Sequence, residues 1–384
     1  MPSLPGGSRL HRPQQRQFPP RTRCWNDHRR RSHSLINRPG LRTAAYRTQA
    51  MAATKILNLA LQGGGAHGAY TWGVLDRLLE QPDIEIGRIS GTSAGALNGA
   101  ALATGYARNG REGARAQLRS LWTRVAAAGL PLAFFLLPLR KPSLGLWDDA
   151  LPLISPYLAN PLGMAPLRQV LNQVVDVDAL QRPEAPSLFV NAVNVHTGLS
   201  RVFGPDELSV DALLASACAP LVFQAVQIEK AFYWDGSYGG NPMLWPLYDE
   251  KADTDLFMIE LTPLQRAEVP MTAKNILNRI NEIASINALV AELREMDACN
   301  RRGADIRLHV LSLADEESPS ALEPSVKRSV GMALFESLHQ TGRSTCERWL
   351  AQHSDALGTR SSTDIDGKYL QPYRQGAPAG FVKE

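Results

Sequence analysis

Apolar and polar positions alternate along the chain in a way that predicts strands separated by helices. The first apolar run, Ile56–Leu61, is hydrophobic on both faces, as is typical of a buried parallel strand. Apolar residues at helical spacing follow it, and Pro82 marks the end of that helix. A second strand, Ile86–Ser90, leads into a helix of small residues over Ala94–Leu102.

The same alternation continues to the carboxyl end. Four more strands are expected, at Ser187–Val195, Gln224–Glu229, Asp255–Leu261 and Ile306–Leu311, and helices at Ile276–Met296 and about Pro324–Leu350. Strands that alternate with helices favour an α/β fold with a central, mostly parallel sheet flanked by helices. The two C-terminal helices either pack on this core or mediate dimerisation, so the oligomeric state stays open.

Charge divides the chain into two unlike parts. Residues 1–50 hold eleven arginines, no lysine and one acid, Asp27, so this leader carries +10 and the remainder −6 of the net charge of +4. The leader is also rich in Pro, Gln and Ser, a composition typical of disorder. It is an over-extended start, a transit-like segment or a basic arm for nucleic acid. We favour the first, because Met51 directly precedes the first strand, and the acidic remainder gives no reason to expect nucleic-acid binding.

The remaining composition argues against several classes of site. Of the 384 residues, 44% are hydrophobic, which is enough for a full core. The four cysteines are too scattered for a disulfide framework or a zinc site, and no acidic or histidine cluster has metal-ligand spacing. We therefore expect no cofactor and no metal. No apolar run reaches the length of a transmembrane helix, so we expect a cytoplasmic protein, at most peripheral to a membrane.

Candidate chemistry lies in two glycine-rich turns that follow the first two strands. The first turn is Gly63-Gly64-Gly65-Ala66-His67-Gly68, and the second is Gly91-Thr92-Ser93-Ala94-Gly95. A serine in G-x-S-x-G between strand and helix is exposed at the top of a sheet, where its hydroxyl can attack an acyl carbon. Neighbouring glycine amides can hold the oxyanion that forms. The two turns indicate a serine hydrolase.

A third motif, Asp235-Gly236-Ser237, lies far downstream and is approached through Ser216–Phe223. In this order the three motifs resemble those of the patatin-like phospholipase family, which has G-G-G-x-x-G, then G-x-S-x-G, then D-G-G or D-G-A. Similarity continues at Arg279–Ile283 and Gly342-Arg343, so the resemblance covers roughly residues 55–365. Ser237 departs from the usual Gly or Ala of the family.

The resemblance implies a three-layer α/β fold with a catalytic domain over 55–260 and a C-terminal strand and helices over 261–384 packed on the core. It also implies a Ser–Asp dyad, in which Ser93 forms an acyl-enzyme and Asp235 takes the serine proton directly. Oxyanion amides would come from Gly63, Gly64 and Gly65, and the motifs are completed by Gly68, Gly91, Gly95, Gly236 and Ser237. The implied activity is that of a lipid acyl hydrolase of the phospholipase A or esterase type, acting on a lipid or another acyl ester.

In residues 126–166 the apolar positions follow neither the spacing of a helix nor that of a strand. The segment also contains many prolines around the apolar run Leu130–Leu137. This segment is either buried irregular structure or a cap that receives an acyl chain or touches lipid. Any membrane contact through it would be transient and peripheral. Head group, acyl-chain length and positional preference are not encoded in any motif that we find.

Two other functions share part of this pattern. An α/β-hydrolase would add His309, His339 or His353 to Ser93 and Asp235 as a triad. A dinucleotide-binding module would use Gly63-x-Gly65-x-x-Gly68 with Glu85, although its next strand need not end in a serine elbow. We expect His67 to lie at most at the edge of the substrate, and Tyr233, Trp234 and Tyr238 to give Asp235 apolar surroundings that raise its pKa.

Overall fold

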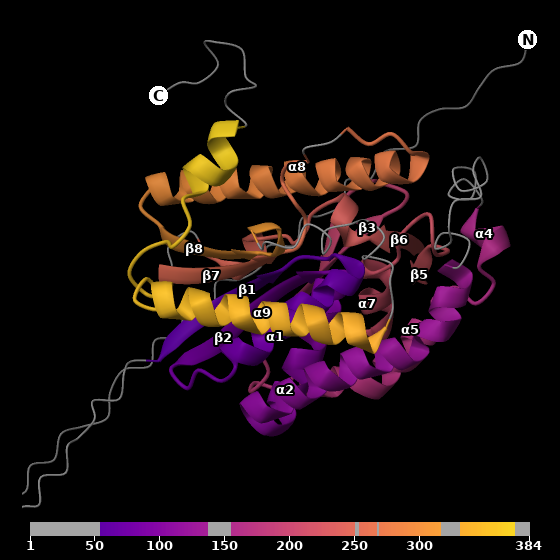
Figure 1. The fold of residues 1–384 in the computed structure, drawn as a ribbon, viewed down its shortest axis with the longest axis horizontal. Coiled ribbons are helices and arrows are strands. Elements are labelled where there is room, and N and C mark those ends of the chain that lie inside the picture. The colour runs from indigo at the N-terminus through magenta and orange to yellow at the C-terminus, as the bar shows by residue number, and fades with distance from the viewer. Residues whose placement is uncertain (1–53, 137–154, 250–252, 267–268, 316–330, 373–384) are drawn as a thin grey trace, which may run out of the picture. The chain divides into compact units, whose positions relative to one another are not determined.

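A computed structural model describes residues 54–136, 155–249, 253–266, 269–315 and 331–372 (Figure 1). The arginine-rich leader and the middle of the 126–166 segment lie outside these residues. The strands are β1 (Lys55–Leu61), β2 (Ile84–Thr92), β3 (Ser187–Asn194), β4 (Ser200–Phe203), β5 (Val226–Ile228), β6 (Ala231–Asp235), β7 (Asp253–Glu260) and β8 (Asp305–Ser312). Six of them lie where the apolar runs predict them, and β4 and β6 were not expected.

The strands form one sheet in the order β5-β6-β3-β2-β1-β7-β8, with β4 also paired to β3. The neighbours β3, β2, β1, β7 and β8 run parallel, and β4, β5 and β6 add antiparallel pairs at one edge. The expected central, mostly parallel sheet is therefore confirmed. Parallel strands align their carboxyl ends, so the loops after β1 and β2 meet at one edge of the sheet.

Alternate residues of the central strands face two separate cores. On β1, Leu57, Leu59 and Leu61 belong to one buried cluster, whereas Ala60 belongs to the other. Each of these leucines is fully buried, which contributes about 1.5–3 kcal/mol per side chain. Burial on both faces requires helices on both sides of the sheet, and this explains the run of apolar residues in β1.

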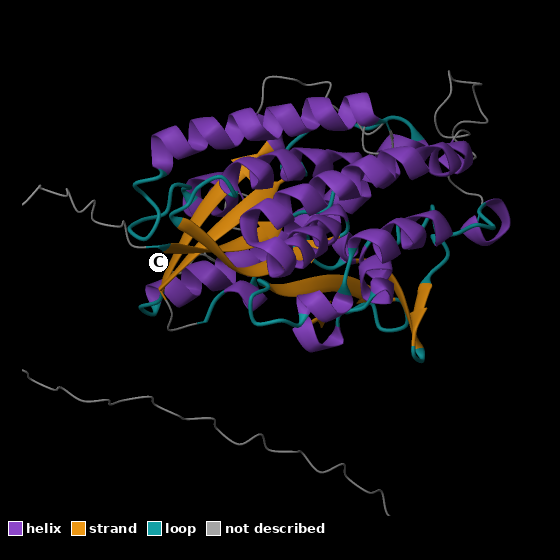
Figure 2. Cartoon of the chain, turned by 90° about the horizontal axis from the view of Figure 1, so that it is seen from below, coloured by secondary structure: helices purple, strands orange, loops and turns teal. Residues whose placement is uncertain are grey.

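The helices cover the two faces of the sheet. They are α1 (Gly68–Leu78), α2 (Ala94–Leu136), α4 (Pro156–Ala159), α5 (Ala165–Val174), α6 (Val177–Leu180), α7 (Val210–Ser216), α8 (Ala273–Arg301) and α9 (Met332–His353). Short 3₁₀ turns are η1 (Gly65–His67), η4 (Pro205–Glu207), η5 (Gly236–Tyr238), η6 (Trp245–Leu247) and η7 (Leu313–Asp315), and η10 (Asp366–Leu370) is a π-helical turn. Helix α8 lies on one face, and α1, α2 and α9 lie on the other (Figures 1 and 2). The structure thus has the three expected layers.

Helix α2 extends further than the small-residue pattern indicates. It is broken at Asn109 and Gly110, where the backbone leaves helical geometry, and then continues to Leu136. The continuation is stabilised because Ala114, Leu118 and Trp122 recur at helical spacing and are buried. The first part of the 126–166 segment is therefore helical, which corrects the expectation of irregular structure there.

Helices α1 and α9 touch at two glycines. A methyl group on Gly73 would lie 2.0 Å from the His339 carbonyl oxygen, and one on Gly342 would lie 2.2 Å from that of Tyr70. This close contact places Arg343 beside Asp76 of α1. Burial alone would raise the pKa of Asp76, but hydrogen bonds from His339, Arg115 and Arg343 outweigh it and hold the pKa below its usual range. The Gly342-Arg343 pair therefore fastens α9 to the core.

Candidate active site

The two glycine-rich turns lie side by side at the carboxyl edge of the sheet. Strands β1 and β2 are paired so that Leu61, the last residue of β1, is opposite Gly91, and β2 ends one residue later. A methyl group on Gly95 would lie 2.1 Å from the Leu61 carbonyl oxygen, so only glycine allows the second turn to approach the first this closely. Ser93, the middle residue of the second turn, is half-buried and has a φ of 53°.

The backbone of Ser93 has the left-handed conformation that a nucleophile elbow requires. A non-glycine residue in this region carries strain of about 1–3 kcal/mol, which the surrounding structure must offset. A contact that helps to offset this strain is the hydrogen bond from the Ser93 amide to Ser216 Oγ, which is 2.9 Å long. Helix α2 begins at the next residue, Ala94, so its partly positive amino end adjoins the serine.

Asp235 ends β6, which pairs with β3 rather than with the strands that carry the glycine turns. Its side chain is only 6% exposed, and Oδ1 accepts a hydrogen bond of 2.9 Å from the Ser237 amide. Burial raises the pKa of Asp235, and hydrogen bonds from the Ser237 amide and from the Ser93 and Ser237 hydroxyls oppose this rise. The structure therefore brings the Ser93 hydroxyl and the Asp235 carboxylate together, although they are 142 positions apart in the sequence.

Asp235 and Tyr233 of the same strand are both buried. Tyr233, two positions earlier on β6, is buried against Phe203 with 5.5 Å between ring centroids. Burial and the nearby Asp235 charge raise the pKa of the Cys218 thiol to about 12, so Cys218 stays protonated. Its carbonyl oxygen accepts the Asp235 amide at 2.8 Å. Burial also raises the pKa of Tyr238.

The first turn lies against the serine. A methyl group on Gly63 would lie only 2.7 Å from Ser93 Cβ, so no larger residue fits there. The Gly63 amide already donates to Asn241 Oδ1, at 2.6 Å. Gly64 precedes the 3₁₀ turn η1 as its N-cap and Gly65 begins it, and the first amides of such a turn have no acceptor within it. Of the three amides expected for an oxyanion, that of Gly63 is thus engaged elsewhere, which corrects its assignment.

Three polar residues of this region were not expected from the sequence. Asn191 of β3 donates to the carbonyl oxygens of Gly236 and Gly240, at 2.9 and 2.8 Å. Asn241 bonds Gly63, and Ser216 bonds the Ser93 amide. Two sequence features could have pointed to the asparagines. Asn191 interrupts an otherwise apolar strand, and Asn241 is followed by a proline shortly after Asp235.

Comparison with known proteins agrees with this geometry. Residues 59–248, which contain both glycine turns and the Asp235 loop, match the family model described as patatin-like phospholipase. The chain carries a patatin-like phospholipase domain. This match supports a lipid acyl hydrolase activity. No curated protein matches the sequence.

Two solved structures are similar to the chain over most of its length. VipD from Legionella pneumophila is 14% identical with a TM-score of 0.38, and the match covers 84% of this chain and 74% of VipD. The heterodimeric complex ExoU-SpcU from the type III secretion system of Pseudomonas aeruginosa contains a chain that is 17% identical with a TM-score of 0.34; the match covers 84% of this chain and 60% of that one. At such TM-scores we draw nothing further from either likeness.

The histidines of the triad alternative make other contacts in the patatin-like chain. His309 Nε2 lies 2.9 Å from Asp255 Oδ1 and its Nδ1 lies 3.0 Å from Ser362 Oγ. His339 Nε2 lies 3.2 Å from Asp76 Oδ2. His353 lies at the end of α9, its ring 5.9 Å from that of Trp349. His67 is fully buried, which is inconsistent with a place at the edge of the substrate.

Ser362, His309 and Asp255 have the chemical order of a triad, but their environment is structural. His309 is fully buried. Burial raises the pKa of Asp255, yet hydrogen bonds from His309, Arg307 and the Gly358 amide outweigh it and lower the pKa. The carboxylate is thus committed to holding the segment after α9 against β7 and β8. Its pairing partner on β1 is Leu57, four positions before the end of β1.

The dinucleotide alternative does not fit the geometry of the patatin-like domain. Glu85 is the second residue of β2 and pairs with Ile56. It is therefore at the amino end of the strand, about 23 Å from Thr92 at 3.3 Å per residue, whereas the glycine turn is at the carboxyl end. A ribose-binding acid would have to lie at the same edge as the glycines.

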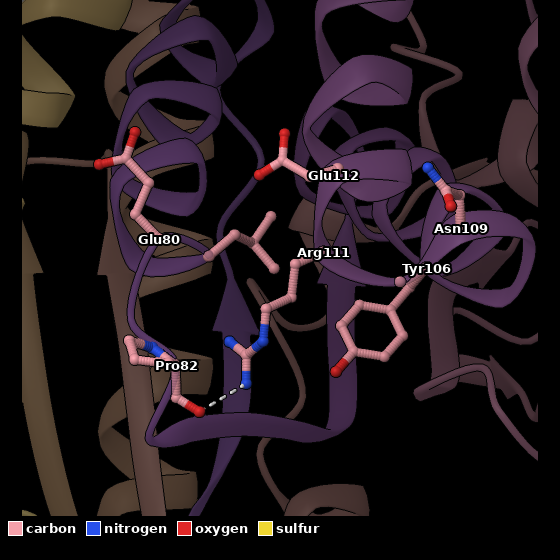
Figure 3. A pocket seen from close by; sticks show the side chains of 8 residues that line it. Glu80, Pro82, Tyr106, Asn109, Arg111 and Glu112 are labelled. Atoms are coloured by element: carbon pink, nitrogen blue, oxygen red, sulfur yellow. Dashed lines mark hydrogen bonds between the residues drawn. The ribbon is translucent and has the colours of Figure 1, made fainter.

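A surface hollow of about 610 Å³ lies near the amino end of β2, whereas Ser93 follows the carboxyl end of that strand; Figure 3 shows side chains that line the hollow. Its lining includes Pro82, Tyr106 and Arg111, near the amino end of β2. The Arg111 guanidinium donates to the carbonyl oxygens of Gln81, Pro82 and Ile84, so it serves to hold the turn before β2. Among the described residues, no group of three or more His, Cys, Asp or Glu side chains is arranged to hold a metal ion. None of the described helices is both long and apolar enough to cross a bilayer.

Proposed function

We propose that the domain hydrolyses acyl ester bonds of lipids through a dyad of Ser93 and Asp235. The observation that carries this proposal is the placement of the Ser93 hydroxyl, on a left-handed elbow, beside a buried carboxylate whose pKa burial raises and this hydroxyl lowers. A more basic carboxylate is a better proton acceptor, so burial compensates for the weakness of aspartate as a base.

In the first half of the reaction, Ser93 Oγ attacks the ester carbonyl carbon while its proton passes to Asp235. The negative charge that develops on the carbonyl oxygen is held by the Gly64 and Gly65 amides at the start of η1. Collapse expels the alcohol, which takes the proton from Asp235, and leaves the fatty acyl group on Ser93. In the second half, Asp235 takes a proton from water, which attacks the acyl-enzyme. The bond to Ser93 Oγ then breaks, Ser93 Oγ takes the proton back from Asp235, and the fatty acid is released.

Helix α8 contacts the loop that carries the proposed base, Asp235–Asn241, which we call the base loop. Ser285 Oγ of α8 donates to the Ser237 carbonyl oxygen at 2.7 Å, and Asn281 hydrogen-bonds Tyr238. We propose that residues 261–384 pack on the catalytic part, residues 55–260, and support it in this way. We assign no cofactor to the reaction, since the proposed steps need only these side chains and water.

We also propose that residues 155–166, the described end of the segment expected to be a cap, make transient, peripheral contact with lipid. Among them, Tyr157 is 60% and Leu158 83% exposed, although both are large and apolar. Asn160 Nδ2 donates to the Val222 carbonyl oxygen at 2.9 Å, and this joins the cap to the segment that leads from α7 to β5. Apolar side chains at that position would favour entry of an acyl chain from a lipid surface.

The products distinguish acyl hydrolysis from other phospholipid cleavage. With phosphatidylcholine as substrate, we expect the protein to release free fatty acid and lysophosphatidylcholine, as measured by mass spectrometry of the lipid extract. The Ser93→Ala protein should release neither. Diacylglycerol or phosphatidic acid as the main product would contradict cleavage at the acyl ester.

A further inference from the structure

Asn241 holds the first glycine-rich turn, Gly63–Gly68, through a reciprocal pair of hydrogen bonds. Because the oxyanion amides proposed here belong to this turn, we call it the oxyanion turn. Its Oδ1 accepts the Gly63 amide at 2.6 Å, and its Nδ2 donates to the Gly63 carbonyl oxygen at 3.2 Å. The side chain is 2% exposed, so water does not compete for either bond. One asparagine amide therefore fixes both polar groups of the glycine that packs directly against Ser93.

The same asparagine belongs to the loop that carries the base. Its neighbour Gly240 is bonded through its carbonyl oxygen by Thr92 Oγ1, at 3.1 Å, and by Asn191 Nδ2. Thr92 in turn immediately precedes Ser93. Contacts therefore close a ring that passes from the serine elbow to the base loop, through Asn241 to the oxyanion turn, and back to Ser93.

We propose that Asn241 is a positioning residue that sets the oxyanion turn relative to Ser93 and Asp235. This inference rests on the proposed function and deepens it. With Gly63 fixed, the next two amides, those of Gly64 and Gly65, are aimed beside the serine without reorganisation during the reaction. Without Asn241, Gly63 loses both partners and the turn is free to shift, and a misplacement of about 1 Å can reduce turnover about 10²-fold.

The test compares Asn241→Ala with Asn300→Ala. Asn300 is a matched control, because its side chain makes the same reciprocal pair with the backbone of Ile306, both bonds 2.9 Å long, but it joins α8 to β8. Turnover of a soluble p-nitrophenyl ester is measured per folded molecule, with the folded fraction taken from a thermal melt. We expect Asn241→Ala to lower kcat about 10²-fold with little change in KM, because oxyanion stabilisation acts in the transition state. Asn300→Ala should keep the kcat of the parent protein.

If the role of Asn241 is purely structural, Asn241→Ala will behave like Asn300→Ala: its melting temperature will fall, and its kcat per folded molecule will equal that of the parent protein. That result would overturn the proposal. Should Asn241→Ala fail to fold, Asn241→Asp takes its place, since it keeps the acceptor for the Gly63 amide and loses the donor. It should likewise lower kcat, and an unchanged kcat would count against the inference.

Ser93→Ala is assayed in parallel, so that failure of the positioning role of Asn241 can be distinguished from failure of the proposed function. If Ser93→Ala is inactive and Asn241→Ala fully active, the dyad stands and the positioning role fails. If Ser93→Ala is active, the proposed function itself fails. The acid limb of the pH profile gives a further check: Asn241→Ala should leave its midpoint unchanged, because the hydrogen bonds to Asp235 come from Ser93 and Ser237.

Discussion

Ser93→Ala is expected to lower the turnover of acyl esters by at least about 10⁴-fold, which is the order of loss when a hydrolase loses its nucleophile. The loss follows because, in the described part of the chain, the hydroxyls that interact with Asp235 are those of Ser93 and Ser237, and Ser237 lies only two residues from Asp235. Ester hydrolysis by the purified variant, with a thermal melt to verify folding, makes the measurement.

Ser362→Ala is the matched control for this variant. It removes a serine hydroxyl that is bonded to a histidine and, through it, to an aspartate, but that lies in the segment after α9. We expect turnover to be unchanged, with a cost to the free energy of unfolding of about 1 kcal/mol for one lost hydrogen bond. Loss of activity in Ser362→Ala with activity retained in Ser93→Ala would transfer the nucleophile to the other serine.

Asp235→Asn should abolish turnover and at the same time stabilise the protein at neutral pH. Asparagine can still accept the Ser237 amide but cannot take a proton, so the attack loses its base. Because burial raises the pKa of Asp235, the folded protein binds this proton more tightly than the unfolded chain does. Stability therefore falls as pH rises from the ordinary range of aspartate through the raised pKa, and it remains lowered above it. Asparagine removes that loss, so its melting temperature should exceed that of the parent protein at neutral pH and approach it in acid.

The pH dependence of activity has the matching sign. The base works only when ionised, so kcat/KM falls as pH decreases through the pKa of Asp235, and it does so above the usual value of about 3.9. Ser237→Ala tests the cause, since the Ser237 hydroxyl favours the charged form. Its removal should move the acid limb of kcat/KM to higher pH. A limb that stays in place in Ser237→Ala, or that moves to lower pH, would contradict this account of Asp235.

Much of the fold could be read from the sequence because the central strands are buried on both faces. The apolar runs of β1 and β3 are long, and each is interrupted by a single asparagine, Asn58 or Asn191. The sequence did not predict strand β6, because its residues Ala231–Asp235 lie near an antiparallel edge of the sheet and several are only partly buried. Their apolar residues therefore do not alternate clearly. The second part of α2 escaped because Gly110 interrupts the pattern, although Leu118 and Trp122 resume it.

The motif residues could be found from the sequence, but the polar contacts that hold them could not. Ser93 and Asp235 stand in recognisable local patterns. Asn241 has no such pattern, because its role depends on a glycine 178 positions away whose amide it meets only in the folded chain. For the same reason, sequence reasoning assigned the Gly63 amide to the oxyanion.

The most direct test of the dyad is the identity of the residue that a fluorophosphonate modifies. Such a probe reacts with a serine hydroxyl that a neighbouring base activates, and peptide mass spectrometry locates the adduct. The account predicts one adduct, on Ser93, which is lost in Ser93→Ala and strongly slowed in Asp235→Asn. An adduct on Ser362 or another serine, or undiminished labelling of Asp235→Asn, would contradict it.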